Sequence, residues 1–70
     1  MFPRIRNLRE DNDYTQTEIA NILKCSQRTY SDYENGRISW SAENLIILAN
    51  FYNVSVDYLL GRTDNKRINL

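Results

Sequence analysis

Two closely spaced helix-start signals constrain the middle of this chain more than any other feature. Thr15 and Glu18 form a capping-box pattern, in which the hydroxyl and the carboxylate each accept a backbone amide at a helix start. Apolar residues then recur on one helical face, at Ile19, Ala20 and Leu23. This helix is expected to end near Lys24, and Ser26 has the residue type of the next cap. The sequence therefore predicts two helices joined by a very short turn.

The flanks of this pair also carry helix signals. Pro3 suits a first helical position, because its missing N–H would be unpaired there, and it begins a predicted helix over residues 3–12. The helix capped by Ser26 is expected over about residues 26–35. Gly36 then stands where a helix end requires positive φ.

The second half of the chain predicts two more helices. Ser41 is a cap and Asn53, which tolerates left-handed backbone, is an end. Apolar residues between them recur at Leu45, Ile46, Leu48, Ala49 and Tyr52. Ser55 then caps a short helix over residues 56–60, which Gly61 ends.

These elements predict an all-α, compact five-helix fold in a single domain. Its ordered core is expected over residues 3–61, followed by a frayed polar tail over residues 62–70 that carries Ile68 and Leu70. Hydrophobic residues make up 41% and charged residues 26%, as in ordinary globular domains. Seventy residues bury a marginal core and leave no room for a separate ligand-sensing domain, so association with a second copy is expected.

The side-chain inventory argues against catalysis and metal binding. There is no histidine, and the lone cysteine, Cys25, excludes an internal disulfide and any His/Cys metal cluster. The acidic residues Glu10, Asp11 and Asp13 are expected to be a solvated surface, so we predict neither an enzyme nor a cofactor. The charged N-terminus and the lack of a long apolar run predict a cytoplasmic protein without contact to a membrane.

Charge alone does not identify a partner. Nine basic and nine acidic residues give a net charge of +0, which argues mildly against nucleic-acid binding. A neutral domain can still present one basic face. Two helices joined by a tight turn, the second beginning at a small polar cap, form the unit that places one helix in a DNA major groove.

Several segments also carry a recognisable set of motifs. They are Thr15-Gln16-Thr17-Glu18-Ile19-Ala20, Cys25-Ser26-Gln27-Arg28-Thr29, Tyr33-Glu34-Asn35-Gly36, Leu45-Ile46-Ile47-Leu48-Ala49 and Val54-Ser55-Val56-Asp57-Tyr58-Leu59-Leu60-Gly61. On these motifs, residues 5–64 resemble the Cro/repressor-type (XRE-like) helix-turn-helix family of bacteria and phages. Lys24 departs from it where a glycine is frequent, and Trp40 where a proline is frequent. The resemblance implies a sequence-specific DNA-binding transcriptional regulator, acting as a repressor.

The resemblance also implies the site residues. Phosphate-contacting positions fall on Gln16, Asn35 and Arg37. Base-reading positions fall on the outward face of the second helix of the pair, on Ser26, Gln27, Arg28, Ser31 and Asp32. Each of these residues also has a plainer interpretation as a helix former or a solvated side chain. An acid such as Asp32 is repelled by phosphates unless it accepts from a cytosine amine.

Further expectations follow from the same resemblance. Arg9 and Glu34 match a salt bridge that ties the first helix to the end of the third. The implied partners are a double-stranded DNA operator and a second copy of the chain, and no small-molecule ligand is predicted. By elimination, and not from the resemblance, helix 56–60 and the tail with Ile68 and Leu70 are the expected dimer surface.

The main rival is an antitoxin-like or protein-interaction module built on the same fold. Ile22 and Ile47 lie where the family tolerates polar residues, so they are expected to be exposed. The aromatic residues could form a stacking platform for single strands, but their helical spacing favours the core. Trp40 is the open case among them.

Overall fold

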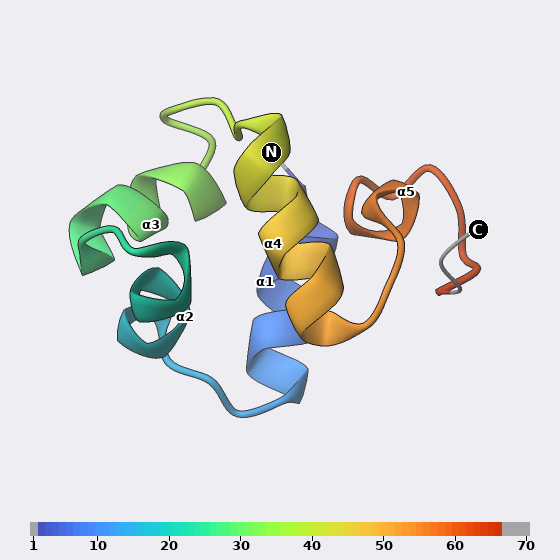
Figure 1. The fold of residues 1–70 in the computed structure, drawn as a ribbon, viewed down its shortest axis with the longest axis horizontal. Helices are drawn as coiled ribbons and strands as arrows, with labels where there is room; N and C mark the ends of the chain where they lie inside the picture. Colours follow the sequence, from blue (N-terminus) through green and yellow to red (C-terminus); the bar gives the residue numbers. More distant parts are fainter. Residues whose placement is uncertain (1, 67–70) are drawn as a thin grey trace.

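The computed structural model describes residues 2–66, and this part of the chain forms five α-helices and no strand. The helices are α1 (Pro3–Asp11), α2 (Gln16–Leu23), α3 (Gln27–Glu34), α4 (Ala42–Tyr52) and α5 (Val56–Leu59), as Figure 1 shows. The predicted ends differ from these by at most one residue. The all-α, five-helix prediction is therefore confirmed.

The helix starts follow from local side-chain chemistry. Four of them have a hydroxyl cap on extended backbone, namely Thr15, Ser26, Ser41 and Ser55. Each hydroxyl accepts the third following amide at 3.0–3.1 Å. At α2 the Glu18 carboxylate also accepts the Thr15 amide at 2.9 Å, which completes the capping box. A cap of this kind stabilises a helix by about 1 kcal/mol.

All five helix ends share one motif. A residue with positive φ follows each helix, and the next amide bonds back to the carbonyl five positions earlier at 2.8–3.0 Å. This is the Schellman arrangement, which satisfies carbonyls that a helix end leaves open. The left-handed residues are Asp13, Lys24, Gly36, Asn53 and Gly61. Both glycines are thus helix stops as predicted, and Lys24 adopts the same conformation without being a glycine.

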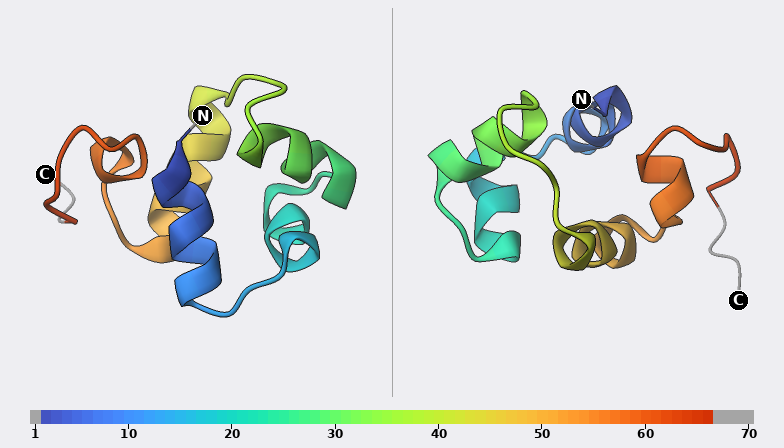
Figure 2. Two further views of the ribbon diagram at one scale, coloured as in Figure 1. Left: turned by 180° about the vertical axis from the view of Figure 1, so that it is seen from behind. Right: turned by 90° about the horizontal axis from the view of Figure 1, so that it is seen from above.

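The helices surround the core. Seen from above in Figure 2, α1 and α4 lie on opposite sides, with the α2–α3 pair at one end and α5 at the other. Each helix contributes buried apolar residues to one cluster: Ile5, Leu8, Ile19, Ala20, Leu23, Tyr30, Leu48, Ala49, Val54 and Leu59. The helix pair is therefore anchored by its inner side, and its outer side remains at the edge of the molecule (Figure 1).

The first residues of the predicted tail, which are described as far as residue 66, contact α1 and the start of α5. Arg4 donates to the Thr63 carbonyl at 2.7 Å and to Asp64 at 3.2 Å, and its guanidinium lies 4.3 Å from the centre of the Tyr58 ring. The Ser55 amide donates to the Lys66 carbonyl at 3.0 Å. The start of α1 lies beside α5, so an arginine there can reach carbonyls that follow α5. Ile68 and Leu70 lie outside the described residues.

The predicted exposure of two isoleucines is wrong. Ile22 and Ile47 are half-buried and pack on the core, whereas Ile46 is 53% exposed. The five consecutive apolar residues 45–49 of α4 cannot all face inward, because a helix turns by about 100° per residue. Trp40 is half-buried and stacks on Tyr33 at 4.7 Å between ring centroids, so it covers the core.

Candidate nucleic-acid interface

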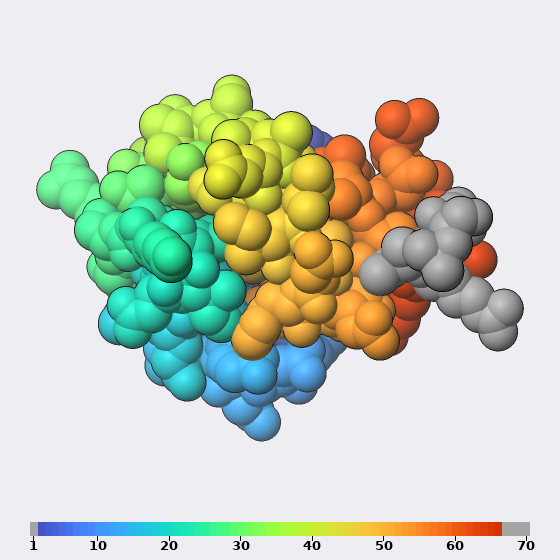
Figure 3. All heavy atoms as spheres, in the orientation of Figure 1, coloured from blue at the N-terminus to red at the C-terminus, as the bar shows by residue number. Residues whose placement is uncertain are grey.

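The turn between α2 and α3 determines how α3 is presented. Lys24 has φ 58°, and the Cys25 amide donates to the Ala20 carbonyl at 3.0 Å. Ala20 and Tyr30 are buried, so the inner sides of both helices are in the core. Cys25 is half-buried against the same core, as expected for a small apolar side chain. The opposite side of α3 therefore faces outward, and atoms of α3 form the upper part of the left margin of the molecule in Figure 3.

The predicted base-reading residues differ in how much of them is exposed. Gln27 and Arg28 are exposed in the first turn of α3, while Ser31 and Asp32 are half-buried one turn later. Ser26 is exposed, but its hydroxyl accepts the Thr29 amide at 3.1 Å and donates to the Thr29 hydroxyl at 2.9 Å. Gln27 and Arg28 are therefore the exposed residues of this set that do not cap the helix.

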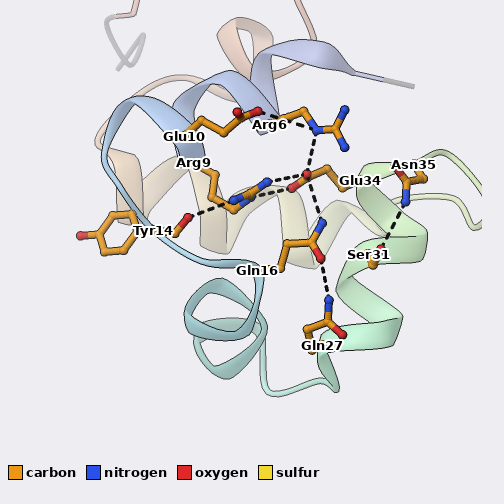
Figure 4. A network of polar contacts seen from close by, with 9 residues as sticks. All are labelled: Arg6, Arg9, Glu10, Tyr14, Gln16, Gln27, Ser31, Glu34 and Asn35. Atoms are coloured by element: carbon orange, nitrogen blue, oxygen red, sulfur yellow. Dashed lines mark hydrogen bonds and ion pairs between the residues drawn. The ribbon is translucent and has the colours of Figure 1, made fainter.

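A hydrogen bond joins a predicted phosphate-binding residue to a predicted base-reading residue. Gln27 Nε2 donates to Gln16 Oε1 at 2.6 Å, and Gln16 Nε2 donates in turn to Glu34 Oε1 at 3.4 Å (Figure 4). Gln16 is the first residue of α2, at the positive end of the helix dipole. The start of α2 and the first turn of α3 thus meet through two amide side chains.

Glu34 is the anchor of this network. Its side chain is fully buried at the end of α3, and Arg9 donates to it from Nε and Nη2, both at 2.9 Å. Arg9 Nη1 also donates to the Tyr14 carbonyl at 3.0 Å, between α1 and α2. The predicted Arg9–Glu34 pair is confirmed. Removing one partner would leave an uncompensated buried charge, a cost of about 3–5 kcal/mol.

The network keeps Glu34 ionised. Burial alone would raise the pKa of Glu34, but its interactions with Arg9, Tyr30 and Arg6 outweigh this effect, and the pKa falls to about 2. The same pair raises the pKa of Arg9, because the carboxylate stabilises the charged guanidinium. Nearby, burial raises the pKa of Tyr52 to about 12, so this tyrosine is neutral at physiological pH.

The other two predicted phosphate-binding residues lie at and beyond the end of α3. Asn35 is exposed, and its Nδ2 donates to the Ser31 hydroxyl at 3.2 Å. Arg37 is largely exposed and pairs with Asp32 at 3.4 Å. A predicted base reader is thus already bound to a predicted phosphate contact in the free protein.

Arg6 is the residue that sequence reasoning missed. It lies on α1, and its Nε donates to Glu34 Oε1 at 3.1 Å (Figure 4). Its spacing of three residues from Arg9 was the available signal, because residues three apart share a helix face. That signal becomes specific only once α1 is known to lie against the end of α3.

Other kinds of site find little support in the part of the chain that is described. No group of three His, Cys, Asp or Glu side chains there is arranged to hold a metal ion. Across residues 2–66, no helix combines the length and the apolar character needed to cross a membrane.

Comparisons with known proteins point the same way as this geometry. Residues 5–59 match the family model described as Helix-turn-helix. The HTH-type transcriptional regulator ImmR of Bacillus subtilis (strain 168) is 36% identical over 66 residues, which cover 94% of this chain and 52% of ImmR. The cryptic phage CTXphi transcriptional repressor RstR of Vibrio cholerae is 36% identical over 61 residues, which cover 87% of this chain and 55% of RstR.

Two further similarities complete the comparison. Antitoxin PezA of Streptococcus pneumoniae serotype 4 is 38% identical over 65 residues, which cover 93% of this chain and 40% of PezA. The crystal structure of a transcriptional regulator from Listeria innocua has a TM-score of 0.81 at 27% identity, over 93% of this chain and 62% of that one. The chain spans about half the length of the curated relatives it matches.

Proposed function

This chain belongs to the Cro/repressor-type helix-turn-helix family of DNA-binding domains, and we propose that it represses transcription by inserting α3 into the major groove of an operator. The observation that carries the proposal is the contact between Gln16 and Gln27, which holds a phosphate-binding and a base-reading amide side by side. The family is non-enzymatic, so the function is binding alone. We assign this work to one domain acting in the cytoplasm.

Gln27 and Arg28 are the main base readers in this proposal. The Gln27 amide can donate to N7 and accept from the N6 amine of adenine, while the planar Arg28 guanidinium fits O6 and N7 of guanine. Both side chains are exposed in the first turn of α3, next to the cap at Ser26. Ser31 and Asp32 lie one turn farther along the same face and take secondary positions in the groove.

In this proposal the phosphate backbone of the DNA is bound by Gln16, Asn35 and Arg37. An amide side chain at a helix start and an exposed arginine after α3 both suit phosphate oxygens. Such contacts set the register of α3 in the groove but carry no sequence information themselves. Arg37 would exchange Asp32 for phosphate on binding, since Arg37 is largely exposed and its ion pair with Asp32, at 3.4 Å, is weak.

We further infer that the repressor acts as a homodimer on a two-fold related operator. One recognition helix covers too few base pairs for useful specificity, and two copies place their recognition helices about 34 Å apart, one turn of DNA. α5 and the chain that follows it are the proposed contact between copies. No small-molecule ligand enters this proposal.

A protein-interaction role is the second candidate, because antitoxin PezA is among the relatives. The exposed apolar side chains Ile46 and Phe51 on α4 would belong to such a surface. A gel-shift titration on random-sequence duplex DNA over a salt series separates the two functions. Repression by DNA binding requires affinity that falls steeply with salt, whereas salt-independent or absent binding would favour the interaction role.

A further inference from the structure

Three donors meet at a single oxygen of the buried Glu34 carboxylate. Arg9 Nη2 lies 2.9 Å, Arg6 Nε 3.1 Å and Gln16 Nε2 3.4 Å from Glu34 Oε1. Arg6 and Gln16 are therefore immediate neighbours, although they come from different helices. A phosphate bound by Gln16 would lie within reach of a guanidinium on Arg6.

Arg6 and Arg9 use their guanidinium groups differently. Arg9 is only 13% exposed, and its guanidinium donates to the Glu34 carboxylate on one side and to the Tyr14 carbonyl on another. Arg6 is 43% exposed and bonds to Glu34 through Nε, while Figure 4 shows its two terminal nitrogens pointing away from the carboxylate, toward the side where Asn35 lies. A guanidinium held by one edge keeps a rigid fork of donors for a second acceptor.

The charge around Glu34 also favours an anion. One buried carboxylate is shared by two arginines, which leaves one positive charge in excess at this point. Glu10 lies 3.8 Å from Arg6, but both side chains are well exposed, so water screens that pair. The excess charge lies beside two proposed phosphate contacts, because Gln16 bonds to the same carboxylate and Asn35 follows Glu34 in the chain.

We propose that Arg6 is a further phosphate-binding residue, which Glu34 holds with its terminal nitrogens directed at the DNA backbone near the contacts of Gln16 and Asn35. The inference rests on the proposed DNA-binding function. Glu34 then has two tasks, because it ties α1 to α3 through Arg9 and orients Arg6 toward the ligand.

The salt dependence of binding tests this role. Arg6→Gln is the main variant, since its amide can still donate to Glu34 while the charge is lost; Arg6→Ala removes both. Each should weaken operator binding by about tenfold and make the slope of log affinity against log salt shallower by about one unit. Glu43→Gln, which removes an exposed charge on α4 outside both the proposed DNA interface and the proposed contact between copies, should leave that slope unchanged.

The possible outcomes separate this inference from the proposed function. If the wild-type chain binds with a steep salt dependence and both Arg6 variants keep the same slope, Arg6 touches no phosphate. If the wild type itself shows no salt-dependent binding, the proposed function fails. Ethylation interference on the operator gives a second reading, because the Arg6→Gln variant should tolerate ethylation at one phosphate where the wild type does not. Urea unfolding of each variant confirms that the protein assayed is folded.

Discussion

The polar residues of α3 and of the loop that follows it should divide into two classes when they are replaced singly. Gln27→Ala or Arg28→Ala removes donors and acceptors that match one base pair, so each should cost about 1–3 kcal/mol at the preferred base. Arg37→Ala removes a phosphate contact, so it should weaken all sequences alike and make the salt slope shallower by about one unit. Selection of binding sites from random duplexes, combined with salt titrations, measures both quantities.

The reverse pattern would contradict the assignment. If Arg37→Ala changed the selected sequence while Gln27→Ala and Arg28→Ala preserved it, α3 would not be the reading element. Ser41→Ala is a suitable control, because its hydroxyl caps α4 and lies outside the proposed interface. It should lower stability by about 1 kcal/mol and leave the selected sequence unchanged.

Asp32 allows a second test at the scale of single residues. Its carboxylate pairs with Arg37 at 3.4 Å and repels phosphates, so Asp32→Ala should release Arg37 and tighten binding to non-specific DNA several-fold at low salt. Glu43→Ala is the control, because Glu43 is an exposed acid on α4, outside α3 and the proposed contact between copies. Weaker non-specific binding by Asp32→Ala would show that the carboxylate helps binding. Lost preference at one cytosine would identify it as a base reader.

At the scale of elements, the α2–α3 turn stores backbone strain at Lys24. A side chain at φ 58° costs about 1–2 kcal/mol, and glycine avoids this cost but loses about 0.5–1 kcal/mol through its freer unfolded chain. Lys24→Gly should therefore stabilise the protein by about 0.5–1 kcal/mol in urea unfolding. Lys24→Ala keeps the Cβ and the strain, so it should give no such gain. Equal stability of the two variants would mean that the turn is not strained.

The Glu34 network should make the free energy of unfolding depend on pH in the acid range. The pKa of Glu34 is about 2 in the folded protein and near 4.5 when unfolded, so its contribution is complete above pH about 4.5 and is lost as the pH falls toward 2. The loss should be about 3 kcal/mol, measured by urea unfolding at a series of pH values. The Glu34→Gln variant should be less stable at pH 7, and its free energy of unfolding should change less between pH 4.5 and 2. Glu43→Gln, an exposed replacement, should keep the acid dependence, and a flat wild-type profile would contradict the assignment.

The elements themselves could be predicted because their signals are local. Each hydroxyl cap acts on an amide three residues away, and each left-handed end acts within its own last turn. Glu34, by contrast, is bound from α1 and α2, and only the packing of these helices shows that Arg6 joins Arg9 there. The Arg9–Glu34 pair was predicted from the family resemblance, not from the spacing of the two residues. Arg4 likewise reaches Thr63 only because α1 lies beside α5.

At the scale of the whole molecule, a net charge of +0 does not prevent DNA binding, because many acids are paired internally. Asp64 pairs with Arg4, and Glu34 is enclosed by two arginines. Arg28 enters no ion pair within residues 2–66 and projects from α3. The charge that faces the DNA thus depends on which arginines remain available on one face, and the net charge of the chain does not report it.

The homodimer proposal predicts how binding depends on operator geometry. Two recognition helices about 34 Å apart fit half-sites whose centres lie one DNA turn apart, about 10 base pairs. Inserting about 5 base pairs between the half-sites turns one of them to the opposite face of the duplex, so cooperative binding should disappear, and a shorter operator with one half-site should bind weakly. Gel shifts on this spacer series, with sedimentation of the protein alone and with operator, measure both effects. The dimer need form only on DNA, because a chain of this size has little apolar surface to spare. Binding that ignores the spacer, together with a single copy of the chain on the operator in sedimentation, would overturn the homodimer and leave α3 as the reader of one half-site.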